Sequence, residues 1–235
     1  MSIWGKLAAA ELLAVGPIAA LLGDRAAPDD RNKRLDQLAE NQVAFTVGVI
    51  VLGAKMAKAD GVVTADEVNA FKAAFKVSNA EMKQAARVFN RAKQDVAGYE
   101  DCAEQLVIVF KGNRKLLEDV LEGLFHIAKA DEALHPEEEQ FLAQVAKRFG
   151  FTDSQFKSIR ARHVAAAERD AYDVLGLEPS VSNEELKSQY RALIADNHPD
   201  KLIARGVPEE FVTIAIEKVA SINEAYDAIV KQRGI

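Results

Sequence analysis

The sequence predicts an all-α protein in which a helical bundle is followed by a small helical hairpin. Apolar residues recur at intervals of three and four through most of the chain, and no stretch alternates like a half-buried strand. Hydrophobic residues make up 49% of the 235 residues and charged residues 28%, which is typical of a globular protein. We expect three parts: an apolar N-terminal segment with a linker (1–31), a helical domain (32–168) and a second domain (170–235).

The N-terminal segment is apolar enough to interact with a membrane. Residues 7–23 contain one charged residue, Glu11, and their length is at the lower limit for a membrane-spanning helix. One basic residue, Lys6, precedes the segment and four lie within residues 25–34, so a spanning helix would leave its C-terminal side in the cytoplasm. We expect no cleaved signal peptide, because no small-x-small site follows. The alternative is a helix buried against its own protein or against a second copy.

An internal repeat organises the domain at 32–168. The tetrapeptide Ala-Lys-Ala-Asp occurs at 57–60 and again at 128–131. In each copy an apolar helix ends at this tetrapeptide, a short loop follows, and a second helix begins with acidic residues. The repeat therefore predicts two similar helical hairpins that pack together within a bundle of about seven helices.

Local signals mark where the helices begin and end. Four capping boxes, in which a hydroxyl and a Glu or Gln side chain satisfy the first backbone N–H groups, predict helix starts at Thr64/Glu67, Ser78/Glu81, Thr152/Gln155 and Ser182/Glu185. Gly112 and Gly150 are the expected C-terminal stops. Between these glycines an apolar stripe at helical spacing predicts a core-facing helix: Leu116, Leu117, Val120, Leu121, Leu124 and Ile127.

Four carboxylates of the repeat are candidate metal ligands. They are Asp60 and Glu67 in the first copy and Asp131 and Glu138 in the second. Near a shared pseudo-twofold axis, such a group would suit a hard cation such as calcium or magnesium. The competing interpretation is that acidic residues in a first helical turn favour the positive end of the helix dipole. A divalent cation is the one cofactor that we consider.

The two hairpins resemble the TerB-like (tellurite-resistance B) helical domain. The residues that carry this resemblance lie within 55–71 and 126–141, where each Ala-Lys-Ala-Asp is followed by an acidic helix start. The resemblance implies a helical fold with an acidic surface, and metal binding in some members. It implies a fold more directly than an activity.

The pattern changes after residue 170. Asp170 and Gly176 delimit a short helix, and residues 183–197 form an amphipathic helix. His198-Pro199-Asp200 and a loop through Gly206 then lead to a long final helix that we expect to begin at Pro208. The core-facing stripe of that helix is Phe211, Ala215, Val219, Ile222, Tyr226 and Ile229. Two long antiparallel helices joined by a loop make a small helical hairpin.

Residues 170–235 resemble the J domain of DnaJ-type co-chaperones. Beside the HPD tripeptide, a Tyr-Arg pair eight residues before His198 and Ile222–Tyr226 (INEAY) in the last helix carry the resemblance. It implies docking on a DnaK-type chaperone and stimulation of its ATP hydrolysis. By the same resemblance the docking residues are His198, Pro199, Asp200, Lys187, Tyr190, Arg191 and Lys201. We expect no enzyme, because no nucleophile or pocket motif accompanies His198 and Asp200.

The whole arrangement resembles the DjlA type of bacterial co-chaperone. This resemblance implies a cytoplasmic protein tethered to the inner membrane, a homodimer formed through the N-terminal segment, and a TerB-like domain for targeting or regulation of unidentified clients. The alternative function is a metal- or stress-responsive TerB-like binding module. The net charge of −6, with no basic block, argues against nucleic-acid binding. Most of this negative charge lies in 170–235, although the corresponding J-domain helix is usually basic.

Overall fold

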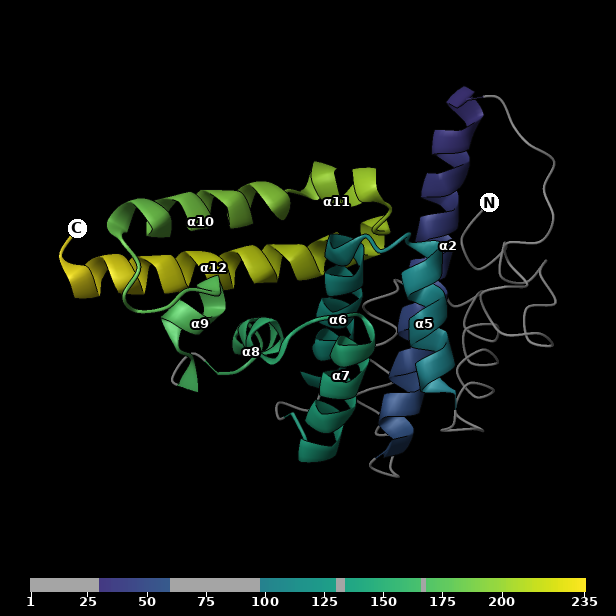
Figure 1. Ribbon diagram of the computed structural model, residues 1–235, viewed down its shortest axis with the longest axis horizontal. Helices are drawn as coiled ribbons and strands as arrows, with labels where there is room; N and C mark the ends of the chain where they lie inside the picture. Colours follow the sequence, from purple (N-terminus) through teal and green to yellow (C-terminus); the bar gives the residue numbers. More distant parts are fainter. Residues whose placement is uncertain (1–29, 60–97, 130–133, 166–167) are drawn as a thin grey trace.

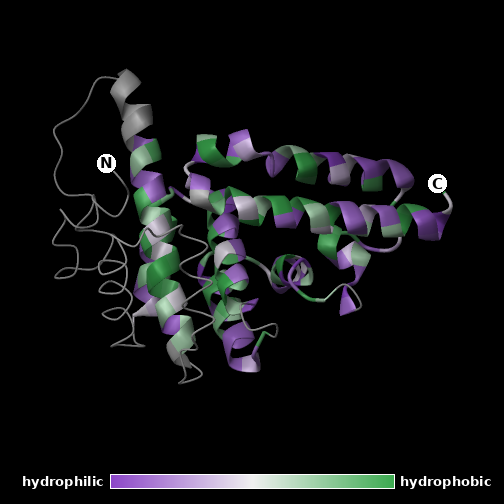
Figure 2. Ribbon diagram, turned by 180° about the vertical axis from the view of Figure 1, so that it is seen from behind, coloured by the Kyte–Doolittle hydropathy of each residue, from purple (hydrophilic) through white to green (hydrophobic). Residues whose placement is uncertain are grey.

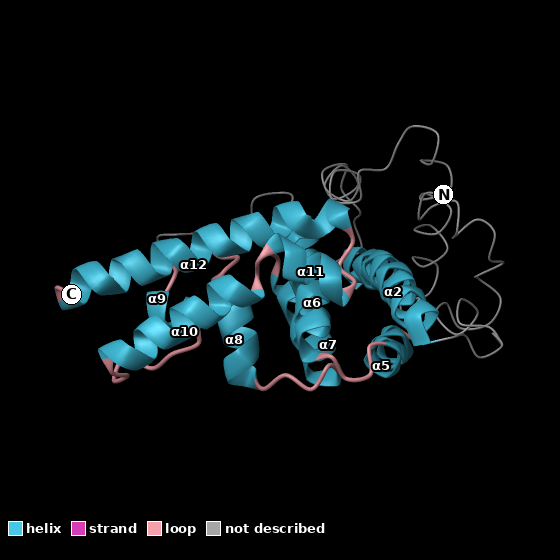
Figure 3. Ribbon diagram, turned by 90° about the horizontal axis from the view of Figure 1, so that it is seen from above, coloured by secondary structure: helices cyan, strands magenta, loops and turns pink. Residues whose placement is uncertain are grey.

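The computed structural model describes residues 30–59, 98–129, 134–165 and 168–235. Within these ranges the secondary structure is helical and contains no strand, which confirms the all-α prediction (Figure 3). The apolar segment at 7–23, the linker that follows it, and the helix starts predicted at Thr64 and Ser78 lie outside the described residues.

The N-terminal part of the described chain is a bundle around one long helix, α2 (Asp30–Ala59). Against it pack α5 (Tyr99–Val109), α6 (Arg114–Ala128) and α7 (Pro136–Arg148), and α8 (Asp153–Ala161) packs against α6 and α7 (Figure 1). The apolar stripe predicted on α6 is confirmed, because all six of its side chains are buried. Figure 2 shows apolar residues gathered along α2 and α6, which pack against each other.

Helix α2 is apolar enough to resemble a membrane span. Its segment Gln37–Ala57 meets the length and composition of a spanning helix, with a mean hydropathy of 1.2. However, 67% of its most apolar window is buried inside the protein. Phe45, Ile50 and Met56 are completely enclosed by neighbouring helices. In this structure α2 is thus the core helix of the bundle.

The capping boxes and glycine stops predicted on described residues are confirmed. The Thr152 hydroxyl accepts from the Gln155 backbone N–H at 3.3 Å, and Gln155 Oε1 accepts from the Thr152 backbone N–H at 3.0 Å. A second capping box of the same kind links Ser182 and Glu185. Gly150 has a φ of 80° and follows the end of α7, in the left-handed region that glycine adopts most easily. Local hydrogen-bonding chemistry therefore sets these boundaries.

The C-terminal part is a hairpin of α10 (Asn183–Asp196) and α12 (Val212–Arg233), with the short α9 (Ala171–Leu175) packed across it. Figure 1 shows α10 and α12 side by side, extending away from the bundle. A second hydrophobic core holds the hairpin together: Ala161, Val174, Leu175, Leu186, Ile222, Ala225 and Ile229.

The segment after the HPD tripeptide differs from the prediction. Residues predicted as a loop form a helix, α11 (Pro199–Arg205), and a 3-10 turn, η4 (Glu209–Phe211), precedes α12. The helix forms because His198 caps its first turn and Pro199 has the φ that a first helical residue needs. The final helix therefore begins at Val212, four residues after Pro208.

The C-terminal part also contributes to the hydrophobic core of the bundle. Five buried residues of the C-terminal part belong to the core of the bundle: Leu202, Val207, Phe211, Ile214 and Ala215. The Phe211 ring packs edge-on against Phe45 of α2, with 4.9 Å between the ring centroids. The start of α12 is thereby embedded in the bundle, while its far end lies within the hairpin.

Gly206 allows the chain to pass close to α2 at the end of α11. Its φ is 103°, and a Cβ atom placed there would lie 2.5 Å from the Cβ of Asn41. The Asn41 side-chain amide donates to the carbonyl of Arg205 at 3.2 Å. A side chain at position 206 would therefore be strained and would also push α11 away from α2.

Candidate functional site

The HPD tripeptide lies at the surface, where α10 ends and α11 begins. His198 Nδ1 accepts from the backbone N–H of Asp200 at 3.2 Å, which fixes the imidazole as the cap of α11. The side chains of His198 and Asp200 are nevertheless 60% and 89% exposed. The Asp200 carboxylate can therefore accept charge-assisted hydrogen bonds from another protein.

The outer face of α10 carries two of the predicted docking residues. Lys187 and Arg191 lie one helical turn apart and are exposed. Neither makes an ion pair with any residue that the structure describes. Both cations are thus available to an acidic surface near the HPD tripeptide.

Tyr190 lies on a different face of α10 from these cations. Its ring stacks on that of Tyr226 with 4.0 Å between centroids, and its hydroxyl donates to Asn223 Oδ1 at 3.0 Å. The structure therefore gives Tyr190 partners on α12, within the hairpin itself. Its aromatic face is turned towards α12, whereas Lys187 and Arg191 point to solvent.

Asp196, the last residue of α10, anchors the base of the HPD loop. Its carboxylate pairs with Lys201 of α11 at 3.4 Å and with Lys115 of α6. Lys201, the remaining predicted docking residue, is therefore held beside the tripeptide with more than half of its side chain exposed. The pair of Lys115 with Asp196 therefore connects the bundle to the hairpin two residues before His198.

Arg205 makes a second and more buried connection at this point. Its Nε and Nη2 donate to the two oxygens of Asp119 on α6 at 2.6 and 2.8 Å. Its Nη1 donates to the backbone carbonyl of Asp196 at 2.8 Å. Burial raises the pKa of Asp119 to about 6, although the hydrogen bonds from Arg205 act in the opposite direction. One guanidinium thus joins α6, α10 and α11.

A cluster of buried charges continues from Asp119 along α6. Arg162, which follows α8, donates to Glu118 and Glu122 at 2.6 and 2.7 Å, and Lys218 of α12 pairs with the same two carboxylates. Burial alone would raise the pKa of Glu118, but the charges of Lys218 and Arg162 outweigh it and lower this pKa to about 2. Carboxylates on the bundle are therefore neutralised partly by a cation from the hairpin.

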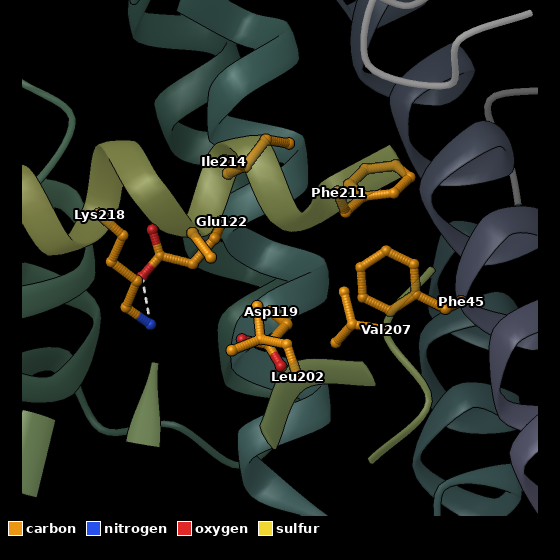
Figure 4. A pocket seen from close by; sticks show the side chains of 9 residues that line it. Phe45, Asp119, Glu122, Leu202, Val207, Phe211, Ile214 and Lys218 are labelled. Atoms are coloured by element: carbon orange, nitrogen blue, oxygen red, sulfur yellow. Dashed lines mark ion pairs between the residues drawn. The ribbon is translucent and has the colours of Figure 1, made fainter. Parts of the chain in front are cut away.

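A small cavity lies at the junction of the two parts. Figure 4 shows Asp119, Glu122 and Lys218 on one side of it, and Phe45, Val207 and Phe211 on the other. The space open to the centre of a water molecule is about 10 Å³. That is room for about one water molecule, and too little for a substrate.

Comparison with known proteins matches this architecture. The family model described as "Tellurite resistance protein TerB" matches residues 46–161, and the model described as "DnaJ domain" matches residues 170–233. A protein of Vibrio cholerae named "Co-chaperone protein DjlA" is 33% identical over 230 residues, covering 84% of this chain and 81% of that protein.

This chain belongs to the DjlA family of co-chaperones.

Further DjlA co-chaperones support the assignment. Those of Photobacterium profundum and Coxiella burnetii are 32% and 31% identical, and each alignment covers more than three quarters of both chains. No solved structure matches the chain. Because it is a DjlA protein with a J domain, the chain is a non-enzymatic regulator whose partner is a DnaK-type Hsp70 chaperone.

The metal site considered for the TerB-like domain of this DjlA protein receives no support from the described residues. Glu138 is buried, and its Oε2 accepts from the His135 backbone N–H at 3.0 Å, as a helix cap does. Asp60, Glu67 and Asp131 lie outside the described residues. In the part of the chain that the structure describes, no three or more His, Cys, Asp or Glu side chains converge as metal ligands would.

Sequence reasoning missed the buried charges that join the TerB-like and J domains of this DjlA chain. A signal for them was present. Lys218 lies three residues after Ala215 and four before Ile222, within the apolar spacing of α12. Asp119 and Glu122 similarly interrupt the core-facing side of α6. A charged residue at a core position usually has a buried partner, but the spacing does not indicate which one.

Proposed function

We propose that this DjlA chain docks on a DnaK-type chaperone through its HPD loop and stimulates ATP hydrolysis by that chaperone. The observation that carries the proposal is the exposure of His198 and Asp200 at a loop whose backbone is otherwise capped and anchored. A loop that is already held in place, with two exposed polar side chains, loses little conformational entropy on binding. The TerB-like domain would then select where, or on which clients, this stimulation occurs.

Charge and stiffness explain how the loop would act. Pro199 fixes the backbone between the two exposed side chains, and Asp200 offers a carboxylate to a cation of the partner. Lys187 and Arg191 add positive charge on the adjacent helix, which favours approach to an acidic surface. An interface of this kind forms quickly, dissociates quickly and weakens with salt.

The test is a substitution at the centre of the loop. His198→Gln should reduce the ATPase rate of DnaK to its unstimulated value, because the exposed imidazole is lost at the point of contact. The measurement is steady-state phosphate release with increasing concentrations of the co-chaperone. His126→Gln is the matched control, because His126 lies on α6 and pairs with Glu217 away from the loop. Undiminished stimulation by His198→Gln would refute the docking mechanism.

We propose that residues 7–23 tether the chain to the inner membrane, with the TerB-like and J domains in the cytoplasm. The apolar length of this segment and the four basic residues that follow it support this orientation. The chain should remain with the membrane fraction after a wash in high salt and leave it in detergent. Release by salt alone would instead indicate that the segment is buried against protein, in this chain or in a second copy.

A further inference from the structure

We propose that the TerB-like domain sets the position of the HPD loop, and that Arg205 is the positioning residue that connects them. This inference rests on the proposed docking function and adds a physical role for the TerB-like domain. Its basis is that one largely buried guanidinium binds a carboxylate of the bundle and, at the same time, the end of the helix that precedes the HPD tripeptide.

The loop is fastened on both sides of the tripeptide. On the preceding side, Arg205 Nη1 holds the carbonyl of Asp196, two residues before His198. On the following side, Arg205 is itself the last residue of α11, and its carbonyl is held by Asn41 of α2. Both ends of the segment 196–205 are therefore fixed relative to the TerB-like domain. Figure 3 shows α11 lying across α6 and beside α2.

The other contacts between the two domains do not combine burial with a hold on the end of α10. Lys218 joins α12 to Glu118 and Glu122, and it contacts neither α10 nor α11 through the pairs that the structure describes. Phe211 packs against Phe45 and α6, again without reaching the loop. Lys115 reaches Asp196 from α6, but half of its side chain is exposed, so this pair is weaker than a buried one.

The chemistry of arginine suits the position. A guanidinium is planar and presents several N–H groups in fixed directions, so it can bind a carboxylate with one edge and a carbonyl with another. A lysine ammonium at the same place would keep the charge but could not reproduce both contacts. The side chains of Arg205 and Asp119 are 13% and 7% exposed, so solvent competes little with their pairing.

The experiment separates positioning from binding. Arg205→Lys and Asp119→Asn are made in the full chain, and DnaK ATPase is measured against co-chaperone concentration. We expect the maximal stimulated rate to fall about three- to ten-fold, because a displaced HPD loop triggers the chaperone less effectively. We expect the half-saturating concentration to change less than about two-fold, because Lys187 and Arg191 still face the partner.

A second measurement reads the loop directly. Amide hydrogen exchange of residues 200–205 should accelerate in both variants by more than exchange in α6 and α12 does. Phe211→Leu is the matched control, because it loosens the same domain junction without touching Arg205. It should lower the unfolding midpoint but leave the maximal stimulated rate near that of the parent.

The outcomes distinguish this inference from the docking proposal. If His198→Gln abolishes stimulation while Arg205→Lys and Asp119→Asn stimulate as the parent does, docking stands and positioning by Arg205 is overturned. An equal loss of maximal rate in Phe211→Leu would also overturn it, because general loosening of the junction would then suffice. If His198→Gln has no effect, the docking proposal itself fails.

Discussion

Glu118, Asp119 and Glu122 place three carboxylates on little more than one turn of α6, at the contact between the two domains. Three cations from outside α6, two of them buried and the third largely buried, neutralise these carboxylates: Arg162, Lys218 and Arg205. Removing ions from water is costly, so such a cluster adds less stability than its short distances suggest. The cluster disfavours other dockings of the hairpin, because they would leave some of these charges buried and unpaired.

The pKa of Glu118 gives this cluster a measurable pH dependence. The folded pKa of about 2 lies below the ordinary value of 4.5, so the ionised carboxylate stabilises the fold above pH 4.5. That contribution is lost as the pH falls from 4.5 towards 2. Glu118→Gln should therefore lower the free energy of unfolding at pH 6.5 by roughly 3 kcal/mol. Between pH 6.5 and pH 3 it should then lose less stability than the parent.

Urea unfolding at several pH values checks this prediction. Asp119 acts in the opposite direction, because its raised pKa of about 6 makes it stabilise the fold as the pH falls from 6 towards 4. The comparison is therefore most informative below pH 4. Glu104→Gln is the control, because Glu104 forms an exposed pair with Arg148. If the free energy of unfolding falls equally with pH in Glu118→Gln and in the parent, the Glu118 carboxylate does not cause the loss of stability in acid.

At the scale of one element, α11 shows what local sequence signals can and cannot predict. The capping boxes at Thr152 and Ser182 were predicted correctly, because each depends on residues within one helical turn. Helix α11 was expected to be a loop. It has seven residues and a single buried side chain, Leu202, so it shows no apolar stripe. It packs against α12 and α2, and Asp119 of α6 binds its last residue, so most of its partners lie far away in the sequence.

The same distinction applies to the site. The place of the HPD tripeptide in the fold, directly after α10, follows from the helix signals near it in the chain. The sequence was therefore sufficient to predict this place. The pairs that hold the hairpin in place join residues 86 to 100 positions apart, such as Arg205 with Asp119 and Lys218 with Glu118. Such pairing depends on how two surfaces dock, and no local spacing encodes it.

Gly206 tests whether the contact of α11 with α2 matters. Gly206→Ala should lower the free energy of unfolding by more than the roughly 1–2 kcal/mol that a left-handed non-glycine residue costs, because its Cβ would also clash with Asn41. Gly234→Ala is the matched control, since Gly234 has a φ of 70° and no atom within 4 Å of an added Cβ. Thermal or urea unfolding of the two variants measures the difference. Equal destabilisation would mean that the approach to Asn41 contributes nothing.

At the scale of the whole molecule, the two domains form one structure in the described residues. Helix α12 begins inside the bundle core, where Ile214 and Ala215 are buried, and ends in the hairpin core, where Ile229 is buried. A continuous helix that belongs to two cores couples them mechanically. The J domain is thereby presented to its chaperone in a fixed orientation on the TerB-like domain.

This coupling predicts that the TerB-like and J domains unfold together. Ile229→Val removes one methyl group from the hairpin core, far from the bundle, and should cost about 1 kcal/mol. In one cooperative unit this cost lowers the urea midpoint read from amide exchange in α6 as much as the midpoint read in α12. Independent domains would instead show a shift in α12 alone. The midpoint of α6 in Ile229→Val therefore decides whether the buried charges and the shared core make two domains into one.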